Sequence, residues 1–209
     1  MKTKASLPHD FIKNQKVSAI VEAYFEFNHL KQLYRQGWLQ RGIPSQNCES
    51  VAEHSFCVTL LTLFLVESYF PELDKWKVIC MALLHDLGEI HAGDLTPLDN
   101  VEASEKQRLE YQSVEKVLSK LPGGSTHLAL WKEFEAGTSP EARFVREIDC
   151  LEMCLQASVY EQQNLVDPKS FFASAEKVLC GSRLLQILKE LESLKTCDDM
   201  ERYNKETIQ

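Results

Sequence analysis

The chain has 209 residues, of which 44% are hydrophobic and 26% carry a charge, so it can bury the core of one domain or of two small ones. Its net charge of −8 argues against a general affinity for nucleic acid or for an anionic membrane surface, because both attract basic proteins. A small anionic substrate is not excluded, since it needs only local positive charge.

The cysteines and the apolar segments indicate a compartment. The seven cysteines form no CxxC pair, and the first ten residues lack the apolar segment of a secretion signal. No apolar run approaches the roughly 20 residues that span a bilayer. We therefore expect reduced thiols and a soluble cytoplasmic protein, with the nucleus as an additional compartment and with no nucleic-acid or membrane partner.

Hydrophobic residues recur at helical spacing along most of the chain, without alternating β-branched runs, Asn-Gly hairpins or internal repeats. No linker is long enough to separate two domains. The sequence predicts one all-α domain over 1–209, a compact helical bundle with its core at about 16–195 and polar ends, including the tail from Cys197. The expected helices cover about 16–36, 50–69, 74–87, 101–121, 126–135, 140–163 and 168–195.

Start and stop signals delimit several of these helices. Gly37 is expected to end the first one. Ser50 with Glu53 three residues later forms a capping box that opens the second. The pairs Ser139-Pro140 and Asp167-Pro168 each combine an N-cap residue with proline at the first helical position, which starts the last two helical regions.

Three of the helices carry residues that bind metals. His54 lies near the start of the second helix, the pair His85-Asp86 follows the apolar run of the third, and Asp149 stands in an apolar stretch of a long helix. A buried carboxylate needs a strong partner, and two imidazoles with two carboxylates leave open positions on a six-coordinate ion. For each histidine alone, the alternative is a core imidazole bonded to a backbone carbonyl.

Three segments carry a resemblance to a known family. They read SVAEHS around His54, HDLGEIHAGDLTP from His85, and VREIDCLEMCLQASVYE around Asp149. They resemble the HD-domain superfamily of metal-dependent phosphohydrolases, and in particular its 5′-deoxynucleotidase branch, over about 31–193. The resemblance implies an HD-domain helical bundle in which His54, His85, Asp86 and Asp149 bind one divalent ion. Mn²⁺ or Co²⁺ is expected, with Mg²⁺, Zn²⁺, Fe²⁺ and Ni²⁺ as alternatives.

The resemblance also assigns four residues around the substrate. Glu89 and Asp94 match the two catalytic acids of the family, and their alternatives are a solvated helix-end carboxylate and a turn residue. On a helix that continues past His85, Glu89 would lie one turn away and act as a general base. Arg35 and Trp38 resemble the Arg and Trp beside the nucleotide. A guanidinium can bond two phosphoryl oxygens, whereas Trp38 can equally be a core residue.

The function implied is a phosphoric monoester hydrolase that converts deoxyribonucleoside 5′-monophosphates into deoxynucleosides and phosphate. The alternatives are another HD-type phosphohydrolase, such as a nucleotide phosphodiesterase or a nucleoside triphosphohydrolase, a dinuclear site that includes His91 or His127, and a non-enzymatic module. Intact Glu89 and Asp94 argue against the last. The expected partners are a small-molecule nucleotide and a second copy of the chain, because family members form homodimers and the apolar stripe of the first helix is broad.

Overall fold

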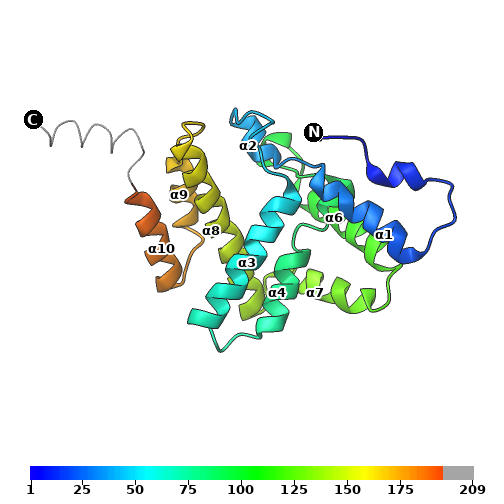
Figure 1. The fold of residues 1–209 in the computed structure, drawn as a ribbon. Helices are drawn as coiled ribbons and strands as arrows, with labels where there is room; N and C mark the ends of the chain where they lie inside the picture. The colour runs from blue at the N-terminus through cyan, green and yellow to red at the C-terminus, as the bar shows by residue number, and fades with distance from the viewer. Residues whose placement is uncertain (195–209) are drawn as a thin grey trace, which may run out of the picture. The chain divides into compact units, whose positions relative to one another are not determined.

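The computed structural model describes residues 1–194, which form helices joined by short loops (Figure 1). Among these residues there is no β-strand, so the predicted all-α class is confirmed. The predictions for Lys195 and for the tail from Cys197 lie outside the described residues. The α-helices are α1 (Ala19–Phe27), α2 (Gln36–Gln40), α3 (Val51–Tyr69), α4 (Lys75–Leu84), α5 (Glu89–Ala92), α6 (Ala103–Leu118), α7 (Gly124–Ala136), α8 (Pro140–Gln162), α9 (Lys169–Ala175) and α10 (Ser182–Glu192), and the 3₁₀ helices are η1 (Pro8–Ile12), η2 (Asn28–Lys31) and η3 (Pro97–Asp99).

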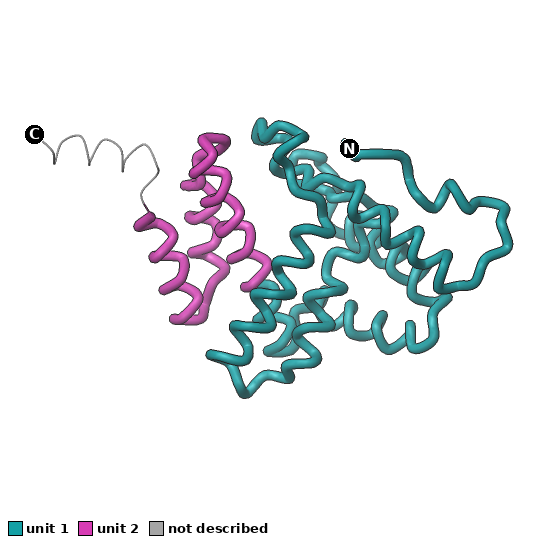
Figure 2. The backbone as a smooth tube through the Cα atoms, in the orientation of Figure 1, with its two compact units in different colours: residues 1–146 teal, residues 147–209 magenta. Residues whose placement is uncertain are grey.

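The chain divides into two compact units, residues 1–146 and residues 147–209, and the second is described as far as residue 194 (Figure 2). Helix α8 begins in the first unit and ends in the second. Each unit buries its own set of apolar side chains. The expected single domain stays a prediction.

The first unit is built on helix pairs that bring the ends of α4 and α5 into its interior. Helix α3 packs on α4, α4 on α7, and α5 on α6. A cluster of buried apolar side chains lies next to the turn between α4 and α5: Leu87, Ile90, Val114, Val117, Leu118 and Trp131. Full burial of an aliphatic or aromatic side chain contributes about 1.5–3 kcal/mol, so this cluster holds the turn firmly in place.

The second unit contains most of α8 together with α9 and α10. Tyr160 on α8, Phe172 on α9 and Leu184 on α10 are among its buried side chains. The carboxylate of Glu147 accepts hydrogen bonds from the backbone N–H groups of Cys180 (3.0 Å) and Gly181 (3.2 Å), just before α10 begins. A carboxylate at that position satisfies free amides and interacts favourably with the helix dipole.

The first helix differs from its prediction. Helix α1 ends at Phe27, and Gly37 lies inside α2 rather than ending a helix. The reason is backbone pairing between distant segments: Val51 N–H donates to Leu33 O (2.9 Å) and Arg35 N–H donates to Glu49 O (3.1 Å). These bonds hold 33–35 in an extended path, so a helix from 16 to 36 is wrong.

The cap signals were more reliable than the lengths. The Ser50–Glu53 capping box is present, with Glu53 N–H donating to Ser50 Oγ and Ser50 N–H donating to Glu53 Oε2. Asp74 caps α4, but that helix ends at Leu84, three residues earlier than predicted. Ser139 accepts from Ala142 N–H at the start of α8. The final helical region consists of two helices, because the helical path is interrupted between Ala175 and Ser182.

Helix α3 is the one helix within residues 1–194 that could cross a membrane by length and composition alone, with a mean hydropathy of 1.4. This corrects the expectation that no apolar segment approaches that length. The same properties occur in core helices of soluble proteins, and α3 packs along α4 while burying the polar residues His54 and Thr62. A buried histidine near one end is typical of a helix that carries a site inside a protein.

Candidate metal centre

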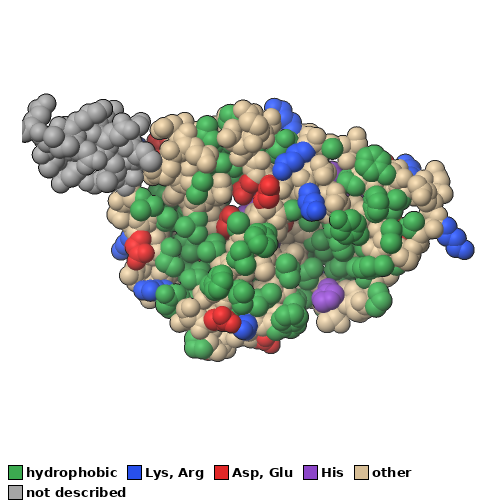
Figure 3. Space-filling view, in the orientation of Figure 1, with side chains coloured by type: hydrophobic (Ala, Val, Ile, Leu, Met, Phe, Trp, Pro, Cys, Tyr) green, Lys and Arg blue, Asp and Glu red, His purple; other side chains and the backbone are tan. Residues whose placement is uncertain are grey.

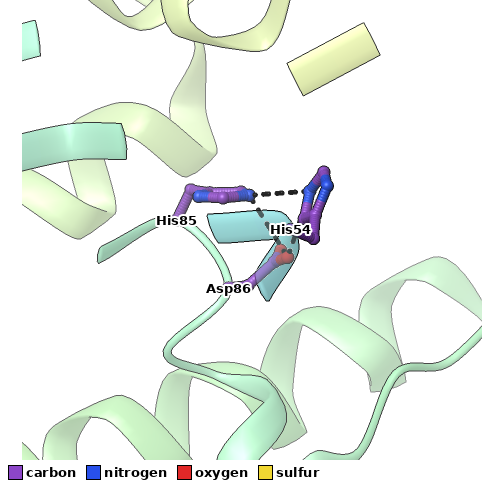
Figure 4. A group of neighbouring side chains, drawn as sticks. All are labelled: His54, His85 and Asp86. Atoms are coloured by element: carbon purple, nitrogen blue, oxygen red, sulfur yellow. Dashed lines mark hydrogen bonds and ion pairs between the residues drawn. The ribbon is translucent and has the colours of Figure 1, made fainter. Parts of the chain in front are cut away.

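His54, His85 and Asp86 come together in the interior of the first unit (Figure 4). His54 lies in the first turn of α3, His85 is the residue that ends α4, and Asp86 follows in the turn before α5. The view shows the two imidazoles pointing toward each other from separate elements, with the Asp86 carboxylate beside them. Both histidines are buried, so these three polar groups need partners within the protein.

The three potential ligand atoms form a small triangle. His85 Nε2 lies 3.4 Å from His54 Nε2 and 3.2 Å from Asp86 Oδ2, and His54 Nε2 lies 3.6 Å from Asp86 Oδ2. Ligand atoms bound to one ion at about 2.1 Å are separated by about 3.0–3.4 Å in octahedral or tetrahedral geometry. The triangle therefore fits three neighbouring positions around a divalent ion.

The backbone prepares His85 for this role. Its Nδ1 lies 2.8 Å from the carbonyl oxygen of Ala82, one turn earlier in α4. A hydrogen bond from Nδ1–H to that carbonyl directs Nε2, rather than Nδ1, toward His54 and Asp86. Trp131 Nε1–H donates to the backbone oxygen of His85 (3.2 Å), and the ring of Phe134 meets the imidazole edge-on. The ring is thus held in one tautomer and one orientation.

Glu89 and Asp94 lie beside the triangle, but not by the route predicted. Helix α4 does not continue to Glu89; instead Glu89 opens the short helix α5, and Asp94 follows Gly93, whose φ of +83° turns the chain. Both carboxyls are buried. Within the described residues, Glu89 Oε2 has no hydrogen-bond partner. A buried oxygen with no bond is costly, which indicates that something absent from the protein chain satisfies it.

Arg35 connects the acids. Its Nη1 lies 3.5 Å from Asp86 Oδ2, 3.5 Å from Glu89 Oε1 and 3.3 Å from Asp94 Oδ1. These separations are long for charged hydrogen bonds, and one nitrogen serves three carboxylates. Arg35 immediately precedes α2, and the first N–H of that helix, on Gln36, donates to Asp94 Oδ2 at 2.5 Å. Asp94 is therefore held by two adjacent residues.

The charges in the cluster move its pKa values in opposite directions. Burial and the neighbouring carboxylates of Asp86 and Asp94 raise the pKa of Glu89 well above its usual value, and Arg35 offsets this only in part. Burial alone would also raise the pKa of Asp86, but the charges of His85, Arg35 and His54 hold it below its usual value. Carboxyls whose pKa values are driven apart are typical of acid–base sites.

Comparison with known proteins gives the family. The HD domain family matches residues 27–188 of this chain. The chain is 36% identical to the protein "5′-deoxynucleotidase HDDC2" of Dictyostelium discoideum over an alignment of 167 residues, which covers 72% of this chain and 87% of that protein. It is 32% identical to the protein of the same name from Homo sapiens over 168 residues, 78% of this chain and 80% of that one. The chain belongs to the HD-domain family.

Solved structures agree with this assignment. The PH0347 protein from Pyrococcus horikoshii OT3 matches this HD-domain chain with a TM-score of 0.71 and 33% identity, over 84% of this chain and 99% of that one. A protein described as a predicted metal-dependent phosphohydrolase, from Magnetospirillum magnetotacticum MS-1, matches with a TM-score of 0.64 and 27% identity, over 83% and 91%. The resemblance found from the motifs is thus confirmed for the family and for the fold.

Two predicted residues of the HD domain remain to be placed. Asp149 lies on α8 in the second unit, half-buried between the core residues Ile148 and Leu151, and its role as a fourth ligand stays a prediction. Trp38 lies on α2 and is only 4% exposed. Its indole N–H donates to Glu49 Oε1 at 2.7 Å, so Trp38 packs behind the Arg35 segment.

Lys106 and Glu110, on α6, are residues of the site region that sequence reasoning missed. Lys106 donates to Leu95 O (3.1 Å) and pairs with Glu110 (3.5 Å). Burial lowers the pKa of Lys106, but Glu110, Glu89 and Asp94 outweigh it and raise the pKa. Burial raises the pKa of Glu110 to about 7. The only sequence signal was a four-residue Lys–Glu spacing, which is common on solvated helices.

Gly88, the small residue of the His-Asp motif, explains how α6 comes so close. A Cβ atom at Gly88 would lie 2.7 Å from the Cβ of Glu110, a contact that real structures essentially never show. Glycine at this position therefore lets the turn between α4 and α5 lie directly against α6. His91 and His127, the residues of the alternative dinuclear site, do not lie in the triangle of His54, His85 and Asp86. His91 pairs with Glu26 (3.5 Å), and His127 is exposed on α7.

Proposed function

We propose that this HD-domain protein is a metal-dependent 5′-deoxynucleotidase, which hydrolyses deoxyribonucleoside 5′-monophosphates to deoxynucleosides and phosphate. The observation that carries the proposal is the triangle of His54, His85 and Asp86 with two buried acids beside it and Arg35 shared among the carboxylates. The names of the curated relatives, which cover most of this chain, support the same activity.

The metal ligands proposed are His54, His85, Asp86 and Asp149, for one divalent ion. The donor set of two imidazoles and two carboxylates suits Mn²⁺ or Co²⁺, and Mg²⁺, Zn²⁺, Fe²⁺ and Ni²⁺ are the alternatives. When bound, such an ion neutralises phosphoryl charge and lowers the pKa of a water. The fit rests on the separations of 3.2–3.6 Å within the triangle and on the orientation of His85 by Ala82.

The remaining site residues act on the phosphate and on protons. Arg35 faces the acids through Nη1 and would turn toward the phosphate once an ion compensates those carboxylates. Glu89 is the proposed general base, because its unbonded Oε2 is available to accept a proton from water. Asp94, whose two oxygens accept from Gln36 N–H and Arg35, is the proposed second catalytic carboxylate and would orient the attacking water. Trp38 supports the segment that carries Arg35.

The direct test is phosphate release from a matched panel of nucleotides. Purified protein loaded with Mn²⁺ or Co²⁺ is given deoxy- and ribonucleoside 5′-monophosphates, deoxynucleoside triphosphates and cyclic nucleotides. We expect release from the deoxynucleoside monophosphates, its loss in His85→Ala and its retention in His127→Ala, where an exposed imidazole is removed instead. Hydrolysis of triphosphates or cyclic nucleotides alone would replace the proposal by another HD-type phosphohydrolase.

The domain and its compartment are proposed on two further grounds. The family match over residues 27–188 extends across the boundary between the two units, which supports a single HD domain over 1–209.

A nucleotide substrate and an acidic net charge support a cytoplasmic protein without nucleic-acid or membrane partners. Fractionation of cells that express the tagged chain tests the compartment, and a membrane-pellet signal that resists high salt would contradict it.

A homodimer is proposed from the exposed apolar face of α1. Ile20, Val21 and Tyr24 are 62%, 39% and 57% exposed, and hydrophobic side chains are frequent on the visible face of the first unit (Figure 3). Exposed apolar patches of this kind are typical of interaction surfaces. Phe64, which is 61% exposed on α3, provides a control outside α1. Light scattering at micromolar concentration should give twice the chain mass for the wild type and for Phe64→Glu. The double variant with Ile20→Glu and Tyr24→Glu should give the mass of one chain. A monomeric wild type would rule the dimer out.

A further inference from the structure

The segment Met1–Lys4 contacts residues next to those of the candidate metal centre, although its four residues are exposed and mostly polar. Exposed polar residues gain little from burial, so hydrogen bonds must hold such a segment in one path. The segment also lies outside the part of the chain that the HD domain family matches, which begins at residue 27. Its contacts are therefore not explained by the fold of the family.

The strongest attachment is a reciprocal pair of bonds with the side chain of Gln36. Lys2 N–H donates to Gln36 Oε1 at 2.8 Å, and Gln36 Nε2 donates to Lys2 O at 2.9 Å. The same amide donates to Tyr34 O at 2.7 Å. Gln36 is 6% exposed, so a buried amide is satisfied by backbone groups on both sides.

Lys4 supplies the second attachment. Its N–H donates to Gln32 O at 2.6 Å, and Thr3 pairs with Leu33 in an isolated antiparallel bridge. The ammonium group of Lys4 lies 3.3 Å from Glu53 Oε2 and over the ring of Tyr34. An exposed ion pair of this kind contributes little, so the backbone bonds carry the attachment.

Met1 makes the third contact, with Gly93. A Cβ atom at Gly93 would lie 2.0 Å from Met1 Sδ, so the methionine side chain rests directly on this glycine. The three contacts fall on Gln36, Glu53 and Gly93, which are the immediate neighbours of Arg35, His54 and Asp94. One short segment thus contacts three residues, each of which is next in sequence to a site residue.

We propose that Met1–Lys4 is a positioning strap for the Arg35–Asp94 pair. Gln36 is the link: its side chain is held by Lys2, and its backbone N–H donates to Asp94 Oδ2 while the preceding Arg35 reaches Asp94 Oδ1. With the strap in place, α2 presents both donors to one carboxylate. The inference rests on the proposed function only where it assigns Arg35 and Asp94 to the substrate; the attachment of the strap does not depend on it.

Two variants detach the strap from opposite sides. Lys4→Pro removes the N–H that bonds Gln32 O, and its matched control, Lys4→Ala, keeps that N–H while removing the ammonium group. Gln36→Leu removes the bonds to Lys2 and keeps the backbone N–H that faces Asp94. We expect Lys4→Pro and Gln36→Leu to lower kcat about three- to tenfold with metal content unchanged, and Lys4→Ala to keep most of its turnover.

Hydrogen exchange at the Gln36 amide gives a reading that does not need activity. This N–H should exchange faster in Lys4→Pro than in Lys4→Ala, because the strap no longer fixes the start of α2. Equal exchange in the two variants, equal turnover in them, or metal loss in step with turnover would each overturn the strap. If the wild type releases no phosphate while the exchange difference is found, the proposed function fails and the strap stands.

Discussion

Two clusters in the first unit each place several carboxylates around one cationic side chain, and they differ in how fully that cation compensates the negative charge. In one, Lys120 Nζ lies 2.6 Å from Glu22 Oε1 and 3.1 and 3.2 Å from the two oxygens of Glu26. In the other, Arg35 Nη1 lies 3.3–3.5 Å from one oxygen each of three carboxylates, Asp86, Glu89 and Asp94. Lys120 is thus shared by two carboxylates, whereas Arg35 is shared by three.

The pKa shifts follow this difference. Burial alone would raise the pKa of Glu26, but His91 and Lys120 hold it below its usual value, and the bond from Lys120 lowers the pKa of Glu22. In the second cluster the charges of His85, Arg35 and His54 also hold the pKa of Asp86 below its usual value, but burial and the carboxylates of Asp86 and Asp94 raise the pKa of Glu89. A buried ion network whose charges are compensated serves the fold, whereas one that is short of positive charge is prepared to accept a cation.

The largest effect should come from removing a metal ligand. His85→Ala takes one corner from the triangle, and we expect the bound ion to fall from about one per chain to near zero, with turnover reduced about 10³-fold or more. Metal analysis and phosphate release on the same preparation measure both. Unchanged metal content in this variant would refute the assignment of the triangle, and the cation-deficient cluster would then need another explanation.

The next effect comes from Glu89→Gln, which keeps the shape of the side chain and removes its basicity. We expect metal content to survive and turnover to fall about 10²–10⁴-fold, because a general base is lost. Near-normal turnover would mean that Glu89 is not the general base. The role would then be assigned to Asp94, and Asp94→Asn would test that assignment. Metal loss together with activity would instead make Glu89 a ligand or a support of one.

These expectations depend on residues that the sequence identified unequally. His54, His85 and Asp86 were predictable because His54 follows a visible helix start and the His85-Asp86 pair follows a visible apolar run. The arrangement of Arg35 was not, since it follows from backbone pairing of 33–35 with 49–51, and such long-range bonds leave no periodic signal.

Other features were hidden for the same reason. The turn between α4 and α5 lies against α6, which depends on Gly88 facing Glu110, two residues far apart in the chain. The strap contacts join segments about thirty residues apart through the backbone of Lys2 and Lys4, and every residue type carries such backbone groups, so the sequence does not mark them. Motifs therefore predicted the three residues that come together in the candidate metal centre, and tertiary contacts decided how Arg35 and Asp94 are held beside them.

A smaller effect should come from the compensated cluster. Glu26→Gln removes the charge that Lys120 and His91 face, and we expect the free energy of unfolding at pH 7 to fall by about 1–3 kcal/mol. Metal content should stay at the wild-type level, since Glu26 is not part of the triangle. Denaturant unfolding of the metal-free proteins measures the first quantity. A variant as stable as the wild type would show that this network contributes nothing net to the fold.

The smallest effect is the pH dependence of that difference. The groups facing Glu26 are Lys120, His91 and, through Lys120, Glu22 with its neighbour His9. Because the pKa of Glu26 is lower in the folded chain than in the unfolded one, its contribution is complete above the unfolded value of about 4.5. It is lost as the pH falls below that value through the folded pKa.

The stability gap between the wild type and Glu26→Gln should therefore be present at pH 7 and should close as the pH falls below about 4.5 through the folded pKa of Glu26. Unfolding curves of both proteins at several pH values, at constant ionic strength, measure the gap. Lys120→Met gives the matched cycle: in its background the substitution of Glu26 should leave a smaller gap at pH 7, because the main cation has gone. A gap that widens as the pH falls would mean that Glu26 is buried in its neutral form, and the contrast between the two clusters would then be lost.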